Sequence, residues 1–346
     1  MTNNVSILDA TLRDGGQGLE DLNKNGFSRL CFDESDKSAI ISHLSQSGVE
    51  MIELGAIGPS KDNKNPFAIY QTIEELSQYL PPTRTDRIMY LGLYIGPDTD
   101  ISLIPQHDES LVEGVRVILR YSELQKSLDY CQALSRKGYK VFVQPMLTMR
   151  YTQDELERVI QSANDMNAYA CYFVDSYGYM GQEDIQRFYE LYDRLLAPGI
   201  RMGFHVHNNM NMAMANAIHF SHMASERPLI LDACATGMGQ GAGNLATEMI
   251  VPYMNTYFGK DYKLDNILEV CDLLDRKMLP SSPWGYSLTC FLPALYKTAY
   301  KYAIMMRMGY HLPFTEINRL LRDMPDDMRN RYTSDNLTKI ISSSNH

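Results

Sequence analysis

Eight short apolar segments recur along the chain, and longer amphipathic segments separate them. This alternation is typical of repeated βα units around a parallel sheet. Eight units spaced about 25 to 45 residues apart predict a TIM (β/α)8 barrel, whose active site lies at the carboxyl ends of the strands. The expected strands are residues 5–8, 51–54, 88–94, 115–119, 141–144, 170–174, 202–206 and 229–233.

The segments between the strands have the spacing of amphipathic helices. Thr152 is a good helix cap, because two acidic residues follow it in the first turn and oppose the helix dipole. Gly259 is expected to end the eighth helix. The competing fold is a doubly wound open sheet, but no G-x-G-x-x-G motif follows the first strand. The expected helices are residues 34–46, 66–80, 125–137, 152–166, 182–196, 210–224 and 242–257.

The sequence changes character at residues 280–283, where two serines and two prolines interrupt the helical pattern. Helical segments rich in methionine and aromatic residues follow at 292–308 and 315–322. These side chains are expected to pack against the barrel rather than to bind a cofactor. We therefore expect residues 1–279 to form the barrel and residues 280–346 to form a small C-terminal helical domain, called the annex below.

Composition restricts the partners and the location. A net charge of −10 argues against a nucleic-acid partner, since such proteins display a basic face. No apolar run approaches the roughly 20 residues that a membrane-spanning helix requires, and no secretion signal precedes the first strand. The six cysteines contain no C-x-x-C pair, so reduced thiols in a cytoplasmic protein are the simplest interpretation.

His205 and His207 lie two residues apart at the end of the seventh expected strand. Side chains at positions i and i+2 of a strand share a face, so both imidazoles can point at one metal ion. Alone, the pair is equally compatible with two histidines that are merely hydrogen-bonded.

Other strand ends carry matching chemistry. Arg13 and Asp14 follow the first strand, and Asp14 offers a hard oxygen ligand. Glu53 lies inside the apolar second strand, and a buried carboxylate needs a partner such as Arg13. The glycine-rich segment after the eighth strand ends at Asn244, whose side chain offers a carbonyl oxygen.

Four elements of the sequence together resemble the DRE-TIM metallolyase family: TLRDGGQ, Glu53, HVHNN and GMGQGAGNLATE. The resemblance covers the barrel. Known members include 3-hydroxy-3-methylglutaryl-CoA lyase, isopropylmalate and homocitrate synthases, and 4-hydroxy-2-oxovalerate aldolase. The short GMGQGAGN loop and the WGYSLTCFL segment of the annex are most similar to the aldolase branch.

The resemblance implies a set of site residues. The implied metal ligands are Asp14, His205 and His207, with Asn244 as a further ligand or its close neighbour. Arg13 would bind and stabilise an enolate, and Glu53 would hold Arg13 in place. The residues implied to contact substrate are Arg13, Gln17, Ser176 and Tyr286, of which Tyr286 would reach into the pocket from the annex and act in catalysis.

The resemblance also implies the activity. We expect a divalent-metal-dependent aldehyde-lyase that cleaves or forms a carbon–carbon bond through a metal-bound enolate of a pyruvate-type 2-oxo acid. Mn²⁺ or Mg²⁺ is the expected metal, and Zn²⁺ or Co²⁺ also suits these ligands. Small 2-oxo and hydroxy-oxo acids are the expected substrates. A homo-oligomer and a docked acylating aldehyde dehydrogenase are the expected partners.

Three alternatives remain open at this point. One is a Claisen-type synthase that uses an acyl-CoA, another is an enzyme similar to 3-hydroxy-3-methylglutaryl-CoA lyase, and a third is a barrel with altered catalysis that binds metal, a ligand or a partner. A Schiff-base aldolase is disfavoured, because no expected strand interior carries a lysine.

Gln17 is the departure that matters most. The aldolase branch has a histidine base at this position, and glutamine cannot titrate. The remaining candidates for the base are Tyr286, Asp175, Cys234 and a metal-bound water. Cys234 does not match the position of the cysteine in the lyase branch and is expected to be structural.

Overall fold

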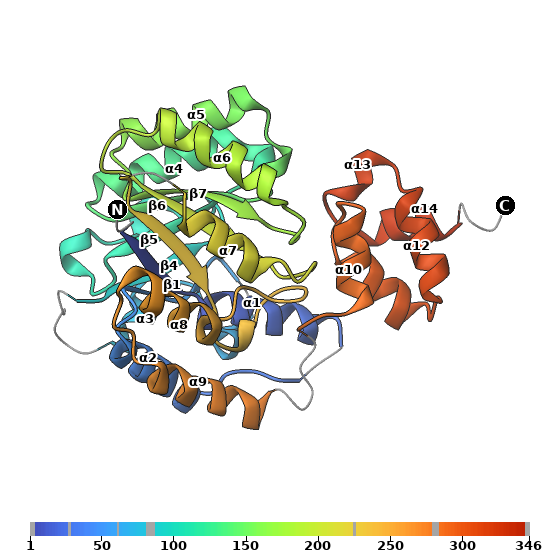
Figure 1. Cartoon of the computed structure of the whole chain (residues 1–346), viewed down its shortest axis with the longest axis horizontal. Coiled ribbons are helices and arrows are strands. Elements are labelled where there is room, and N and C mark those ends of the chain that lie inside the picture. Colours follow the sequence, from blue (N-terminus) through green and yellow to red (C-terminus); the bar gives the residue numbers. More distant parts are fainter. Residues whose placement is uncertain are drawn as a thin grey trace.

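The computed structural model describes residues 4–26, 29–60, 62–80, 87–223, 226–278 and 284–342, and its core is a closed parallel barrel (Figure 1). The first strand, β1 (Val5–Asp9), pairs with both the last strand and the second one, which closes the ring. This confirms the TIM barrel. The other seven barrel strands are β2 (Met51–Ile57), β4 (Met89–Tyr94), β5 (Gly114–Leu119), β6 (Lys140–Pro145), β7 (Ala170–Asp175), β8 (Arg201–Val206) and β9 (Leu229–Ala233).

All eight predicted strands are present, because parallel strands covered on both faces produce apolar runs that are easily recognised. Most predicted helices are confirmed as well. Thr152 forms a capping box, in which its hydroxyl accepts a hydrogen bond from Glu155 N and Glu155 accepts one from Thr152 N. The confirmed helices are α2 (Glu34–Ser47), α4 (Leu124–Arg136), α5 (Gln153–Asp165), α6 (Gln182–Leu195) and α7 (Ala213–Ser221).

The helix predicted over residues 66–80 is wrong. Only a short helix, α3 (Glu74–Ser77), forms there, and Ala68 has a left-handed backbone with φ 49°. The residues after Ala68 instead form a short strand, β3 (Ile69–Tyr70), which pairs in parallel with the end of β2. Backbone pairing with β2 therefore outweighs the helical propensity of this segment.

The helix predicted to begin at residue 242 begins five residues later, as α8 (Thr247–Phe258). Leu245 O accepts a hydrogen bond from Cys234 N, which keeps the residues before the helix extended. Gly259 ends α8 with φ 64°, as predicted. Helix α9 (Leu264–Lys277), which was not predicted, packs against α2 and α8.

The TLRDGGQ segment begins a helix, α1 (Thr11–Lys24), which is not among the predicted helices. Its glycines allow close approach of neighbouring backbone, not a sharp turn. A Cβ atom at Gly16 would lie 2.0 Å from Phe67 O, and one at Gly18 would lie 2.7 Å from Gly239 O. Helix α1 is therefore pressed against the loops that follow β2 and β9.

The annex is a separate group of helices with its own apolar core, which includes Tyr302, Leu321 and Leu337. The single helix predicted over 292–308 is interrupted, because Lys297 has a left-handed backbone with φ 54°. The break predicted at residues 280–283 lies outside the described residues. The annex helices are α10 (Leu288–Leu295), α11 (Lys301–Ile304) with a π-helical turn at Met305–Gly309, α12 (Phe314–Arg322), α13 (Asp326–Arg329) and α14 (Ser334–Ser342).

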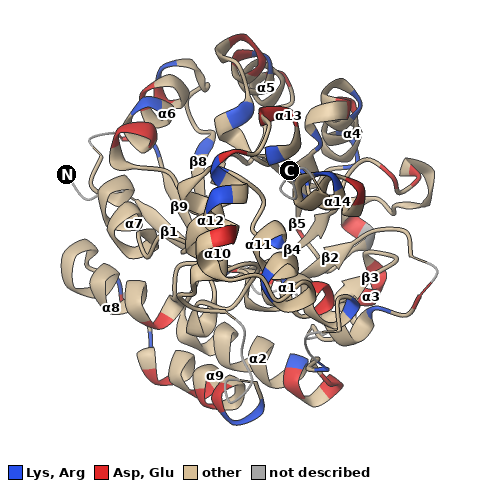
Figure 2. Cartoon of the chain, turned by 90° about the vertical axis from the view of Figure 1, so that its right-hand side faces the viewer, with Lys and Arg blue, Asp and Glu red and all other residues tan. Residues whose placement is uncertain are grey.

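The annex lies over the carboxyl ends of the strands, and Figure 2 shows its helices in front of the barrel mouth. Tyr177, just after β7, donates a hydrogen bond to Asn330 O at 2.9 Å. Lys301 of α11 forms an ion pair with Asp21 of α1. The annex thus covers the end of the barrel at which chemistry is expected. None of the described helices is long and apolar enough to span a membrane.

Candidate metal centre

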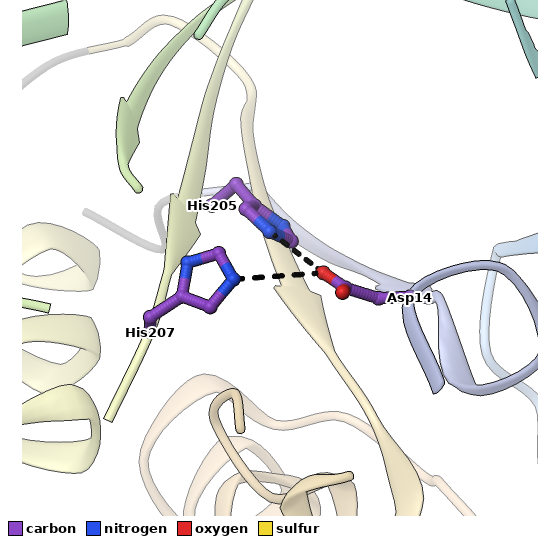
Figure 3. Close-up of side chains that lie close together, drawn as sticks. All are labelled: Asp14, His205 and His207. Atoms are coloured by element: carbon purple, nitrogen blue, oxygen red, sulfur yellow. Dashed lines mark ion pairs between the residues drawn. The ribbon is translucent and has the colours of Figure 1, made fainter. Parts of the chain in front are cut away.

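Asp14, His205 and His207 converge at the barrel mouth (Figure 3). Asp14 comes from the first turn of α1, His205 from the end of β8, and His207 from just beyond that strand. Asp14 Oδ2 lies 3.1 Å from His205 Nε2 and 3.8 Å from His207 Nε2. All three side chains are buried, and their candidate ligand atoms lie within 4.8 Å of one another.

Hydrogen bonds on the far side of each imidazole fix which nitrogen is available. His205 Nδ1 lies 2.9 Å from Asp232 Oδ2, and His207 Nδ1 lies 3.0 Å from the carbonyl oxygen of Asp175. Both partners accept hydrogen bonds, so the proton of each neutral ring is assigned to Nδ1. The lone pair of each ring is then on Nε2, which faces Asp14, and this is the arrangement of a metal-binding histidine.

The electrostatics of the cluster also fit a cation. Burial lowers the pKa of His207 to about 4, so this ring is neutral at neutral pH. Burial alone would raise the pKa of Asp14, but Arg13 and the two histidines outweigh it and hold that pKa well below its usual range. Burial would lower the pKa of His205, yet hydrogen bonds to Asp14 and Asp232 raise it. A proton and a metal ion therefore compete for His205 Nε2.

Asn244 supplies a further oxygen beside this cluster. Its backbone forms an isolated bridge with His207, and its amide nitrogen donates to Met238 O at 3.0 Å. Its Oδ1 atom is buried and has no hydrogen-bond partner among the described residues. A buried carbonyl oxygen without a donor fits a ligand to a divalent cation.

Arg13 lies beside the metal cluster and contacts two carboxylates. Its Nε donates to Glu53 Oε2 at 2.6 Å, which confirms the expected ion pair, and its Nη1 lies 3.1 Å from Asp14 Oδ2. Gln17 Oε1 accepts a hydrogen bond from the same Nη1 at 3.3 Å. Arg13 Nη2 is buried, and none of the described groups accepts its hydrogens. This nitrogen is suited to bind an anionic oxygen.

Arg116 and Asp232 belong to the site, although no role was predicted for either. Arg116, on β5, is fully buried, and its Nε lies 2.9 Å from Glu53 Oε1 as a charge contact rather than an aligned hydrogen bond. Its Nη1 donates to Asp232 Oδ2 at 2.5 Å and to Gln144 Oε1 at 2.8 Å. The signal that could have revealed Arg116 was the one used for Glu53, namely a charged residue inside an apolar strand.

Two of the predicted substrate contacts, Ser176 and Tyr286, differ in where they lie relative to the strand ends. Ser176 lies at the end of β7 and accepts a hydrogen bond from Leu147 N at 2.8 Å. Tyr286 is 59% exposed, and its ring lies against Phe291 of α10. No described contact joins Tyr286 to Asp14, so the structure does not place Tyr286 in the pocket.

Tyr300, at the start of α11, is the annex tyrosine that faces the mouth. Its hydroxyl lies 3.5 Å from Asp21 Oδ2 and 3.5 Å from Gln240 Oε1. Burial and the negative charges of Asp21 and Asp14 raise the pKa of Tyr300 well above its usual value. Tyr300 is therefore a hydrogen-bond donor and not a base at neutral pH.

The two other titratable candidates for the base are constrained. Burial raises the pKa of Asp175 to about 7, and its two carboxylate oxygens accept backbone hydrogen bonds from Tyr179 and Met180. Burial raises the pKa of the Cys234 thiol well above its usual range. Cys234 is thus a neutral, buried side chain, consistent with a structural role.

Comparison with known proteins agrees with this geometry. A family model described as HMGL-like matches residues 114–274. The matched region contains Arg116, both histidines, Asp232 and Asn244. Over residues 114–274 the chain is thus similar to the HMGL-like family. This family is enzymatic, and it implies a divalent metal, for which the Asp14 cluster is the candidate site.

Among the relatives of this chain is 4-hydroxy-2-oxovalerate aldolase 2 of Comamonas testosteroni, which is 26% identical over 78% of this chain and 76% of its own length. Oxaloacetate decarboxylase of Mycobacterium tuberculosis is also 26% identical, over 82% of this chain and 79% of its own length. The crystal structure of the N-terminal domain of a Bacteroides vulgatus protein assigned as an aldolase has the same fold, with a TM-score of 0.72 at 20% identity, and the match covers 91% of this chain and 99% of that one.

Proposed function

We propose that this chain is a metal-dependent aldolase that cleaves 4-hydroxy-2-oxo acids to a pyruvate-type 2-oxo acid and an aldehyde. The observation that carries the proposal is the convergence of Asp14, His205 and His207 beside Arg13, whose Nη2 has no acceptor among the described residues. The names of several relatives at about 25% identity support the same activity.

In the proposed reaction, the bond between C3 and C4 of the substrate breaks, and its electron pair becomes an enolate on the 2-oxo acid. The C4 hydroxyl gives its proton to water as its oxygen becomes the aldehyde carbonyl, and the enolate takes up a proton from water at C3, so that no proton is gained or lost overall. A divalent cation bound at the cluster would act as a Lewis acid toward the 2-oxo acid. Arg13 contributes a second positive charge that stabilises the developing oxyanion. Glu53 keeps the Arg13 guanidinium in position.

Tyr300 is proposed to serve the other end of the substrate. Because its pKa is raised, it keeps its proton and can donate a hydrogen bond to the hydroxyl or aldehyde oxygen. Tyr300 thereby replaces Tyr286, for which this role was expected. Ser176 and Gln17 remain proposed contacts of the substrate.

The nature of the ligands favours Mn²⁺ or Mg²⁺ over softer ions. Asp14 and Asn244 offer oxygen atoms, and the two histidines offer one nitrogen each, with no thiolate among the candidate ligands. Such mixed nitrogen and oxygen sites suit Mn²⁺ well, and Mg²⁺ is suited if water completes an octahedron. A homo-oligomer and an acylating aldehyde dehydrogenase partner remain proposals that rest on the family resemblance alone.

A second candidate activity is decarboxylation of oxaloacetate, and Gln17 is the observation that favours it. Loss of CO₂ from a 3-carboxy-2-oxo acid leaves the same enolate, but it requires no base to remove a hydroxyl proton. A site with glutamine in place of the histidine base can perform this step. The relative named oxaloacetate decarboxylase supports the candidate.

A direct assay tests both activities. Purified protein is incubated with Mn²⁺ and either a panel of 4-hydroxy-2-oxo acids or oxaloacetate, and pyruvate is measured through lactate dehydrogenase. Turnover of a panel member is expected, and no turnover of any compound by protein that retains metal would refute the proposal.

The site itself is tested with two histidine variants. His205→Ala is expected to lose both bound metal and activity, because it removes a ligand from the cluster. His222→Ala is the matched control, since His222 follows the last residue of α7, is exposed and contacts Tyr253 instead. Equal metal content in the two variants would exclude the proposed site.

A further inference from the structure

The metal cluster and the anion-binding arginine belong to one closed ring of buried charges. Each member contacts the next at 2.5 to 3.1 Å. The ring spans the interior of the barrel from α1 through β2, β5, β9 and β8 and returns to α1. Its members, in order, are Arg13, Glu53, Arg116, Asp232, His205 and Asp14.

Arg116 is the member that connects the two sides of this ring. On one side it contacts Glu53, which holds Arg13, and on the other it contacts Asp232, which holds His205. Three further contacts fix its guanidinium: Gln144 accepts from Nη1, Asp232 Oδ1 accepts from Nη2, and the ring of Tyr172 lies 4.5 Å from its central carbon. A planar guanidinium can bridge two carboxylates in this way, and a lysine ammonium cannot.

Nothing in the proposed reaction requires Arg116 to touch the substrate. It is fully buried beneath the residues that face the mouth, and its donors are used by Glu53, Asp232 and Gln144. A buried cation is costly to desolvate, so a fixed position in the interior needs a reason beyond stability.

We propose that Arg116 is a positioning residue that couples the metal ligand His205 to the anion-binding Arg13, acting through Asp232 and Glu53. The inference rests on the proposed function, since it assigns a task to residues of that site. Asp232, oriented by Arg116, keeps the proton of His205 on Nδ1 and leaves Nε2 for the metal. Glu53, oriented by the same guanidinium, directs Arg13 toward the substrate.

Two variants separate the two sides of the ring. Asp232→Asn keeps the shape but replaces an acceptor with an amide that can donate to His205, so the wrong ring nitrogen would carry the proton. Arg116→Lys keeps the charge but cannot hold Glu53 and Asp232 together. Tyr192→Phe is the matched control, because Tyr192 is fully buried on α6 and its aromatic ring packs against Phe173 instead of a member of the charged ring.

The first experiment titrates metal-free protein with Mn²⁺ alone and monitors binding through the electron paramagnetic resonance signal of the free ion. Asp232→Asn is expected to weaken Mn²⁺ binding about 10- to 100-fold. Arg116→Lys is expected to weaken it as well, and Tyr192→Phe to change it less than about 3-fold. If Asp232→Asn and Arg116→Lys bind Mn²⁺ as tightly as the unchanged protein, the inference is overturned.

The second measurement distinguishes positioning from general damage. In Asp232→Asn, the Mn²⁺ concentration needed for half-maximal activity is expected to rise, while KM at saturating Mn²⁺ stays near its original value. In Arg116→Lys, KM is expected to rise too, because Arg13 is released on the other side. If Arg116→Lys changes kcat alone, the coupling is refuted.

Folding and the proposed function are controlled separately. If Arg116→Lys does not fold, Gln144→Leu replaces it, because this variant loosens Arg116 while every charge stays in place. Gln144→Leu is then expected to weaken Mn²⁺ binding in the same direction, and unchanged binding would overturn the inference. If the unchanged protein binds Mn²⁺ but turns over no substrate, the proposed function fails while the Mn²⁺ comparison still judges the ring.

Discussion

Replacing Glu53 with glutamine is expected to destabilise the barrel far more than replacing any partly exposed carboxylate. Glu53 is fully buried, with one oxygen 2.6 Å from Arg13 Nε and the other 2.9 Å from Arg116 Nε. At an effective dielectric constant of about 20, each contact corresponds to about 6 kcal/mol of attraction before desolvation is counted. Removing one partner of a buried ion pair costs about 3–5 kcal/mol, because the remaining charges stay buried. We expect a loss in this range for Glu53→Gln.

Glu113→Gln provides the comparison. Glu113 immediately precedes β5 and pairs at 2.9 Å with Lys140, whose side chain is 44% exposed. A partly exposed pair contributes about 0–1 kcal/mol. Urea unfolding monitored by far-UV circular dichroism measures both variants, since the single tryptophan, Trp284, belongs to the annex and packs against the barrel core, so that its fluorescence would not report on the barrel alone. Equal losses in the free energy of unfolding for the two variants would show that the buried ion pairs of Glu53 do not stabilise the barrel more than a partly exposed pair does.

Two further predictions concern Tyr300 and Asp9. Tyr300→Phe is expected to lower kcat/KM about 10- to 100-fold, because it removes one hydrogen-bond donor to the reacting centre. Tyr286→Phe, at an exposed position, should leave steady-state kinetics unchanged. If Tyr286→Phe lowers kcat/KM and Tyr300→Phe does not, the role belongs to Tyr286. Burial raises the pKa of Asp9 from 3.8 to about 6, so its contribution to stability is fully present below about pH 4 and is lost as the pH rises through 6. In Asp9→Asn the amide oxygen can still accept from Thr11 N, and the amide nitrogen can donate to the Thr247 hydroxyl, so both contacts persist without a charge. This variant should be more stable than the original protein by about 1–3 kcal/mol at pH 8 and by nothing at pH 4, as measured by urea unfolding. A variant that is equally stabilised at both pH values would contradict this.

The sequence predicted the barrel because each strand is an apolar run between amphipathic segments. It failed where a local signal competed with tertiary contacts. Residues 66–80 have a helical pattern, but backbone pairing with β2 makes part of them a strand. Helix α1 was missed because three glycines suggested a loop, whereas the close approach of Phe67 and Gly239 explains them.

The site was predictable where its residues lie near strand ends, as with Asp14 and His205, or where a charge interrupts an apolar strand, as with Glu53. Arg116 was missed because its partners come from four strands, and a single sequence does not reveal which side chains meet across a barrel. Tyr300 was missed for a related reason. The orientation of the annex on the mouth decides which of its tyrosines faces the site, and no local pattern encodes that orientation.

Helix α1 carries Asp14 near its start and Asp21, the partner of Lys301, seven residues later. With a rise of 1.5 Å per residue, these two positions are about 10 Å apart along the helix axis. One helix therefore sets the distance between the candidate metal ligand and the residue that anchors the annex. Because Tyr300 precedes Lys301 in the annex, a change in how the annex attaches to α1 would move Tyr300 relative to Asp14.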